Sequence, residues 1–307
     1  MFYTLTLNPA IDANSYAHDI KINEVNRTKN SHYSSNGKGI NVSKVLKAFN
    51  IESKVLGLFG GFTGEYIIKD LKESGIDTIP VIIDKDTRIN YFVSFDENEI
   101  KFVDEGPSID RKYLNEIISI IKKLENGDYL SINGSLPKNV SKEFYDEIFQ
   151  SVLNKNINVI LDISSSHLKS LLKYNPILIK PNFEELSDIF NFTLQSENDV
   201  IESLKTVNSM GAKNILLTDG ENGMYFMNGN EIYKCNSPKI NFFSSACCGD
   251  ASLAAFLANY FNDETIENSL KYSAAAGANV AEHAGIGPLD KVEDYIKKVK
   301  VKKIWQK

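Results

Sequence analysis

The chain has 307 residues, of which 42% are hydrophobic and 10% aromatic, and its formal net charge is -6 at pH 7. This size suits one large α/β domain, or such a domain with a small accessory element. The negative charge argues against a general nucleic-acid surface, so a phosphate ligand would have to be met by local Lys, Arg and backbone N–H groups. No Gly/Ser/Pro-rich linker divides the chain, and we predict a single domain over residues 1–307.

The termini and cysteines suggest a cytoplasmic protein. The N-terminus has no basic region followed by a long apolar stretch, and no later segment approaches membrane-spanning length. The three cysteines are an odd number, and the adjacent pair Cys247 and Cys248 suits neither a disulfide framework nor zinc-ligand spacing. We therefore interpret them as reduced thiols and expect a soluble, cytoplasmic location.

The first predicted strand runs from Phe2 to Leu7, with a proline just behind it. In open α/β sheets ligands bind at the carboxyl ends of the strands, and this strand would deliver residues 8–12 to that edge. Asp12 could therefore hold sugar hydroxyls, although an Asp that begins a surface loop is equally ordinary.

A glycine turn that carries a lysine follows, at Gly37-Lys38-Gly39, and apolar residues at helical spacing predict a helix after it. Lys38 can meet an anion there, but a glycine follows it where a Walker A loop has Ser or Thr. A second glycine-rich turn occupies residues 60–64. Its spacing is not Gly-x-Gly-x-x-Gly, which disfavours a Rossmann dinucleotide site.

Residues 76–103 are predicted to form short strands that no helix separates, which indicates a small antiparallel element added to the main sheet. Residues 87–90 are predicted as a connecting turn and residues 96–98 as a hairpin. Arg88 could clamp a phosphate in bidentate fashion. A solvated arginine on an edge strand fits the spacing about as well.

From residue 109 onward helical stripes alternate with short strands, which indicates parallel βαβ units. Asn182 and Glu185 follow one such strand and share a face at a helix start, where they could orient water on a magnesium ion. Routine capping explains the same pair. Residues 224–235 are predicted as a hairpin, and the Lys-rich residues 297–303 as a solvated last helical turn.

The stretch from Ser244 to Phe256 is the centre of the candidate site. A strand-like run ends there, small residues crowd the turn, and a helix is predicted behind it. The first N–H groups of a helix have no intrahelical partner, so a phosphate can be held by the main chain alone. Asp250 could then receive the proton of an attacking hydroxyl, but an N-cap is the ordinary use of such a residue.

Taken together, these motifs resemble the ribokinase-like (PfkB) family of carbohydrate kinases, in its 1-phosphofructokinase and tagatose-6-phosphate kinase branch. The resemblance rests on segments 5–12, 25–27, 37–42, 60–64, 87–90, 134–137, 180–186 and 249–250. It implies a three-layer α/β fold with a mostly parallel sheet, flanked by helices, and a small β lid formed by residues 12–35 and 86–104. In the family this lid closes over the sugar and often pairs with a second subunit's lid, so a homodimer is implied.

The resemblance also implies roles for individual residues. The catalytic turn would comprise Cys247, Cys248, Gly249 and Asp250. The substrate would be bound by Asp12, Arg27, Gly37, Lys38, Gly39, Asn41, Arg88 and Asn90, with Lys38, Arg88 and Arg27 on the phosphate it already carries. ATP would be bound by Asn182, Thr218, Gly220, Gly223 and Asn279, and Glu185 would meet Mg2+ through water. Small residues from Ser273 to Asn279 suit the adenine side or close helix packing.

Two positions depart from the family pattern. Cys247 replaces a glycine, and if its φ must be positive the cost is about 1–2 kcal/mol. Asn36 stands where a second glycine usually precedes Gly37. Thiols near a helix N-terminus have lowered pKa values, so we expect redox-sensitive activity. The same helix dipole should make Asp250 a poor base, because it favours the anion.

The resemblance implies ATP-dependent phosphorylation of a ketohexose monophosphate, with fructose 1-phosphate as the first candidate and fructose 1,6-bisphosphate as its product. Tagatose 6-phosphate is the alternative substrate. An alternative of another class is a sugar-phosphate-binding protein that has lost turnover through Cys247 and Cys248. A nicotinamide oxidoreductase is a distant third reading.

Overall fold

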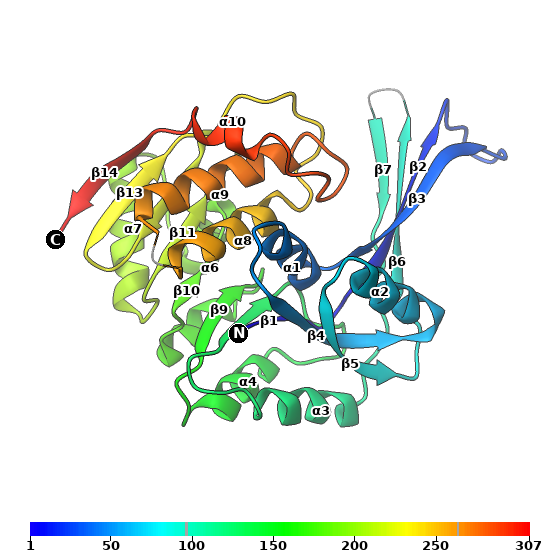
Figure 1. The fold of residues 1–307 in the computed structure, drawn as a ribbon, viewed down its shortest axis with the longest axis horizontal. Coiled ribbons are helices and arrows are strands. Elements are labelled where there is room, and N and C mark those ends of the chain that lie inside the picture. The colour runs from blue at the N-terminus through cyan, green and yellow to red at the C-terminus, as the bar shows by residue number, and fades with distance from the viewer. Residues whose placement is uncertain (96–97, 263) are drawn as a thin grey trace.

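The computed structural model describes residues 1–95, 98–262 and 264–307. The strands of its large sheet are β1 (Phe2–Thr6), β4 (Ser53–Gly60), β5 (Asp77–Ile83), β8 (Tyr129–Asn133), β9 (Asn158–Asp162), β10 (Leu178–Ile179), β11 (Ile215–Thr218), β12 (Met224–Met227), β13 (Glu231–Cys235) and β14 (Val301–Gln306). A second, smaller sheet contains β2 (Ala10–Ala17), β3 (Thr28–Asn36), β6 (Arg88–Phe95) and β7 (Asn98–Phe102). Figure 1 shows this smaller sheet projecting from the body of the molecule.

The helices lie on both faces of the large sheet (Figure 1). They are α1 (Lys38–Ala48), α2 (Gly61–Glu73), α3 (Arg111–Ile121), α4 (Phe144–Val152), α5 (Leu168–Leu171), α6 (Phe183–Phe190), α7 (Glu197–Ser209), α8 (Cys248–Tyr260), α9 (Ile266–Val280) and α10 (Val292–Ile296), with 3-10 turns η1 (Leu172–Tyr174) and η2 (Gly220–Asn222). Among the described residues, none of these helices is both long enough and apolar enough to cross a membrane.

The large sheet has the order β14-β13-β12-β11-β10-β9-β8-β1-β4-β5. β1 pairs in parallel with β4 and β8, so it is a central strand as predicted. Successive residues face opposite layers. Leu161 and Ile179 belong to one core cluster, whereas Ile160 and Leu178 belong to another, and all are fully buried. Burial on both faces explains why these strands appear as continuous apolar runs, and the predicted three-layer α/β class is confirmed.

The prediction for residues 76–103 was wrong in its sheet assignment. β5 pairs in parallel with β4 in the large sheet, while β6 pairs in parallel with β2 and antiparallel with β7 in the small one. Arg88 opens β6 and is not in a turn. An apolar run shows that a strand exists but not which sheet it joins. Of the predicted hairpin turn, residues 96 and 97 lie outside the described part of the chain.

At the C-terminus the predicted helical turn over residues 297–303 was also wrong. α10 ends at Ile296, and the chain continues into β14, an antiparallel edge strand beside β13. Val301 and Trp305 pair with Cys235 and Ile232. Apolar contacts with the core therefore outweigh the helical preference of the lysines. The hairpin of β12 and β13 is confirmed.

A cluster of hydrogen bonds ties α4 to residues 167–174. Asp146 accepts from His167 Nε2 at 2.6 Å, from Tyr174 Oη at 2.8 Å and from Lys173 Nζ at 2.8 Å. Burial alone would raise the pKa of Asp146, but the hydrogen bonds from Lys173, His167 and Tyr174 outweigh it and lower the pKa to about 2.

We expect Asp146→Asn to lower the free energy of unfolding by about 1 kcal/mol at neutral pH. A carboxylate with a depressed folded-state pKa stabilises the fold above its unfolded pKa of 3.8, and that contribution is lost as the pH falls from there toward 2. Urea unfolding at neutral and acid pH, with the exposed Asp188→Asn as control, measures this. A difference between wild type and variant that does not shrink in acid would contradict the assignment.

Candidate active site

A row of polar residues crosses neighbouring strands of the large sheet at their carboxyl ends. Thr6 of β1 pairs with Asn133 of β8, which pairs with Asp162 of β9, and Lys180 directly follows β10. Paired residues of adjacent strands face the same side of a sheet. This edge is where ligands bind in open α/β sheets, and it lies under the start of α8.

Asp162 is the central charge of this row. Its side chain is 1% exposed, and Oδ1 accepts from Lys38 Nζ at 3.3 Å and from Lys180 Nζ at 3.2 Å. Burial would raise the pKa of Asp162, but the charges of Lys180 and Lys38 hold it below its ordinary value. Oδ2 has no hydrogen-bond partner among the described residues, and the side-chain amide of Asn133 has none either. The site therefore contains buried polar atoms that a ligand or water could satisfy.

Asp250 lies in the first turn of α8 and is 6% exposed. The N-cap is Cys247, so the alternative interpretation of Asp250 as a simple N-cap does not hold. Asn41 Nδ2 donates to Asp250 Oδ2 at 2.8 Å. A Cβ added at Gly249 would lie 3.2 Å from Lys180 Nζ, so this turn lies directly against the lysine.

The pKa of Asp250 is raised to about 6. Burial is the largest cause and the negative charge of Asp162 the second, and together they outweigh the opposing effects of Lys38, Asn41 and Lys180. The expectation that the helix dipole makes Asp250 a poor base was therefore wrong, because it considered the helix end without the burial of Asp250 and without the nearby Asp162 carboxylate. A carboxylate with this pKa is a competent proton acceptor near neutral pH.

The small sheet contributes a third carboxylate, that of Asp12. Asp12 accepts from Asn90 Nδ2 at 2.8 Å and, through its other oxygen, from Asn36 Nδ2. Asn36 Oδ1 in turn accepts from Asn41 Nδ2 at 2.8 Å. Hydrogen bonds therefore run without a break from Asp12 through Asn36 and Asn41 to Asp250. Sequence reasoning noted Asn36 only as a replaced glycine and missed this bridge.

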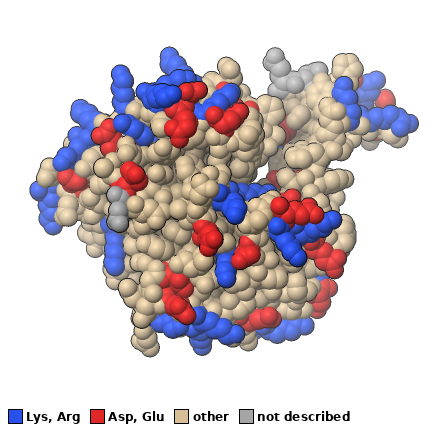
Figure 2. All heavy atoms as spheres, in the orientation of Figure 1, with Lys and Arg blue, Asp and Glu red and all other residues tan. Residues whose placement is uncertain are grey.

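A cavity of about 620 Å3 adjoins these groups. Its lining includes Asp12, Asn36, Asn41 and Cys247, and residues 284–289 also contribute to it. Figure 2 shows the surface hollowed where the body meets the projecting small sheet, with Lys and Arg side chains near that margin. Small polar groups of this kind suit a hydroxyl-rich ligand.

The predicted phosphate-binding cations are placed differently from one another. Lys38 pairs with Asp162 on the Asp250 side of the site. Arg88 Nη2 donates to the carbonyl oxygen of Asn8 at 3.0 Å, and burial lowers its pKa. Arg27 is exposed on the connection between β2 and β3, at the outer end of the small sheet. The structure therefore brings Lys38 and Arg88 toward the site but not Arg27.

Asn182 and Glu185 form a capping box at the start of α6. Asn182 Oδ1 accepts from the Glu185 N–H at 2.7 Å, and Glu185 Oε2 accepts from the Asn182 N–H at 2.9 Å. Ser164 Oγ donates to the other oxygen of Glu185. The capping interpretation is thus confirmed. In the described part of the chain, no group of three or more His, Cys, Asp or Glu could hold a metal ion.

The predicted nucleotide loop follows β11. Thr218 ends that strand and forms a β-bridge with Asn182. Gly220 has φ 51° and open space around it, whereas a Cβ at Gly223, with φ 99°, would lie 2.0 Å from the Cys235 carbonyl oxygen. Gly223 is therefore required by the turn itself.

Asn279 has a structural use that the sequence did not indicate. Its side chain is fully buried, donates to the Pro288 carbonyl at 2.8 Å and accepts from the Lys291 N–H at 2.8 Å. Ser273 Oγ of the same helix donates to the Ser252 carbonyl at 2.8 Å. The small residues of α9 thus provide close packing against α8, one of the two predicted uses.

The expected low thiol pKa values were wrong. Burial raises the pKa of Cys248 to about 11 and also raises that of Cys247, and the charge of Asp250 adds to both. Burial and the charge of Asp250 therefore outweigh any stabilisation of the thiolates by the helix dipole. We expect both thiols to react slowly with iodoacetamide at neutral pH and activity to survive brief peroxide treatment. Mass spectrometry of labelled peptides measures this, and rapid modification would contradict it.

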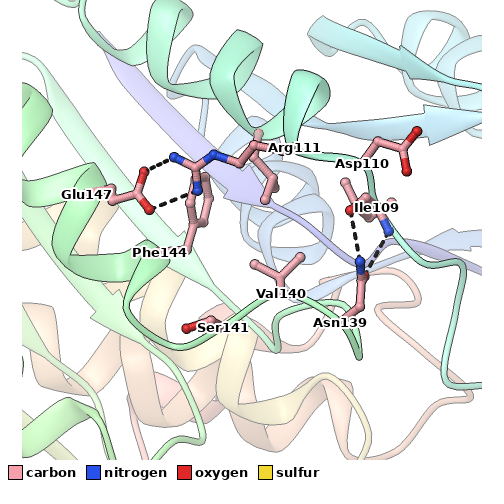
Figure 3. Close-up of a pocket in the computed structure, with 9 residues that line it drawn as sticks. Ile109, Asp110, Arg111, Asn139, Val140, Ser141, Phe144 and Glu147 are labelled. Carbon is pink, nitrogen blue, oxygen red and sulfur yellow. Dashed lines mark hydrogen bonds and ion pairs between the residues drawn. The ribbon is translucent and has the colours of Figure 1, made fainter.

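A second cavity, of about 410 Å3, lies between α3 and α4. Figure 3 shows Arg111 paired with Glu147 across it, and Asn139 bonded to the backbone of Ile109. Arg111, Glu147 and Asn139, which supply most of its polar lining, are therefore already engaged with protein partners. The cavity beside Asp250 is the better candidate site.

Comparison with known proteins agrees with this geometry. Residues 5–291 match the family described as pfkB family carbohydrate kinase. The chain is 40% identical to a D-tagatose-1-phosphate kinase of Klebsiella oxytoca over 98% of this chain and 99% of that one. It is 34% identical to a 1-phosphofructokinase of Borreliella burgdorferi over 99% of each chain. The solved phosphofructokinase-2 of Escherichia coli shares the fold, with a TM-score of 0.91 at 24% identity over 97% and 98% of the two chains.

Proposed function

Because this chain belongs to the pfkB family of carbohydrate kinases, we propose that it transfers the γ-phosphoryl group of ATP to the C6 hydroxyl of a ketohexose 1-phosphate. The buried carboxylate of Asp250, held by Asn41 beside the sugar-sized cavity, is the observation that carries the proposal. Relatives named for tagatose 1-phosphate and fructose 1-phosphate support the substrate class. Fructose 1-phosphate, which would yield fructose 1,6-bisphosphate, is the first candidate.

In this proposal the residues around the cavity have separate roles in binding and in phosphoryl transfer. Asp12, with Asn90 and the glycine turn at residues 37–39, holds the sugar hydroxyls. Asp250 accepts the proton of the attacking hydroxyl, and the first N–H groups of α8 hold the phosphoryl oxygens. Lys38 and Lys180, the latter not predicted from the sequence, neutralise the charge that accumulates on those oxygens. Phosphoryl transfer needs little beyond this positioning and neutralisation.

The remaining contacts concern phosphate and nucleotide. Arg88 would exchange a backbone contact for the phosphate that the substrate already carries. The nucleotide would lie along Asn182, Thr218, Gly220 and Gly223, beside the helix that carries Asn279. Magnesium would enter with the ATP phosphates and be met by Glu185 through water, where it would neutralise phosphate charge.

We also propose a homodimer through the small sheet. Tyr33, Tyr91 and Phe102 lie in one cross-strand row and are 58%, 50% and 60% exposed. Their cross-strand row alternates with that of Asp12, and Tyr33 also lines the cavity, so pairing there would bring the partner subunit to the edge of the cavity. Light scattering of wild type and Tyr91→Asp tests this. A monomeric wild type would refute it.

The function is tested by coupled ADP release with magnesium-ATP and, in turn, fructose 1-phosphate, tagatose 1-phosphate, tagatose 6-phosphate, fructose 6-phosphate and fructose. We expect turnover with a ketohexose 1-phosphate. Folded, reduced protein that binds fructose 1-phosphate in calorimetry but turns over none of the five would instead support a non-catalytic sugar-phosphate-binding protein.

A further inference from the structure

Two side chains that line the sugar-side cavity, Asn36 and Cys247, meet at one amide nitrogen. Asn41 Nδ2 lies 2.8 Å from Asn36 Oδ1, 3.3 Å from Cys247 Sγ and 2.8 Å from Asp250 Oδ2. An amide nitrogen carries two hydrogens, so these acceptors outnumber the donors available. Asn41 is 3% exposed and cannot turn to solvent for relief. The position of its amide is therefore set by a competition among the acceptors.

Cys247 has a backbone conformation that is unfavourable for a residue with a side chain. Its φ is 63°, in the left-handed region that glycine adopts freely and residues with a Cβ do not. Strained backbone of this kind persists mainly where the side chain is used. Here the side chain lines the cavity and accepts from Asn41.

Asn36 connects the same amide to the sugar-binding carboxylate. Its Nδ2 donates to Asp12, while its Oδ1 accepts from Asn41 and, at 2.6 Å, from the Gly37 N–H. Both ends of the Asn36 amide are thus engaged. Any shift of Asn36 moves the donor on Asp12 and the acceptor for Asn41 together.

We propose that Asn36 and Cys247 act as one specificity-determining pair that places the Asn41 amide between the sugar and Asp250. The pair holds Asp12 through Asn36 and Asp250 through Asn41, so it sets the position of both carboxylates relative to the bound sugar. Fructose 1-phosphate and tagatose 1-phosphate are C4 epimers and present their hydroxyls differently to this fixed arrangement. The pair therefore discriminates between the two sugars. This inference rests on the proposed function, since it assumes that a ketohexose 1-phosphate fills the cavity.

The test compares Asn36→Ala, Cys247→Gly and the double variant in kcat/KM for the two epimers. Whichever epimer the wild type prefers, each single variant should reduce that preference at least about tenfold. Because both residues act through Asn41, the double variant should show less than the product of the two single effects. Unchanged preference in both single variants, or strictly multiplicative effects, would overturn the proposal.

Two matched control variants distinguish a specific effect on epimer preference from a general loss of stability or activity. Asn50→Gly relieves another left-handed residue, with φ 58°, at an exposed site outside the cavity. Asn139→Ala removes a bridging amide that bonds to Ile109. Both should keep the wild-type epimer preference, and a loss equal to that of the Asn36 and Cys247 variants would refute a local effect.

The two proposals fail in different ways. Wild type that turns over one epimer, with variants that keep its preference, refutes the pair and leaves the function standing. Wild type that neither turns over nor binds either sugar phosphate in calorimetry refutes the function, and the pair with it.

Discussion

Asp250→Asn is expected to lower kcat by a factor of about 10²–10⁴, while sugar-phosphate affinity stays close to that of the wild type. Asparagine keeps the shape of the side chain but cannot accept the proton of the acceptor hydroxyl. Single-turnover kinetics with magnesium-ATP, together with calorimetric titration of fructose 1-phosphate, separate chemistry from binding. An equal loss of affinity and rate would show that Asp250 binds the sugar rather than serving as the base.

The pH profile of the wild type provides an independent test of the same residue. The base must be ionised to act, and burial with the charge of Asp162 raises the pKa of Asp250 to about 6. We therefore expect kcat/KM to fall about tenfold per unit below that pH and to level above it. A profile that stays flat well below the pKa would contradict the assignment, whereas Asp250→Asn should lose this acid limb altogether.

The site residues that could be predicted from the sequence are those that belong to local sequence motifs. Asp12, Asn41 and Asp250 each follow a strand or a glycine turn, and the structure links them in one chain of hydrogen bonds. Asp162 and Lys180 were missed, although a signal existed. Each is a charged residue at the end of a strongly apolar strand, a position where an unpaired charge would be costly to bury.

Other features depend on tertiary contacts that no local pattern records. β5 and β6 have similar apolar composition, yet they join different sheets. The pKa of Asp250 is raised by burial and, through space, by Asp162, which is distant in sequence. Only the fold places these groups together, so the direction of that shift could not be inferred from the helix end alone.

The second large effect concerns Asp162 itself. Asp162→Asn is expected to lower kcat about 100-fold without raising the KM for magnesium-ATP. The wild-type carboxylate holds Lys38 and Lys180 together through one oxygen, at 3.3 and 3.2 Å. Without that charge the lysines separate, so they still attract the triphosphate but no longer meet the transferring group in the required geometry.

The same variant should be less stable, by about 3–5 kcal/mol, because Lys180 is 5% exposed and loses its only described carboxylate partner. The acid limb of its pH profile should move to lower pH, since Asp162 is the nearby negative charge that adds to burial in raising the pKa of Asp250.

Asp146→Asn, which removes a carboxylate from an ion pair outside the site, is the matched control and should leave both kcat and the pH profile unchanged. Asp162→Asn could instead lose stability but keep, per folded molecule, the wild-type kcat and the wild-type pH profile. In that case Asp162 would stabilise the fold and have no role in catalysis.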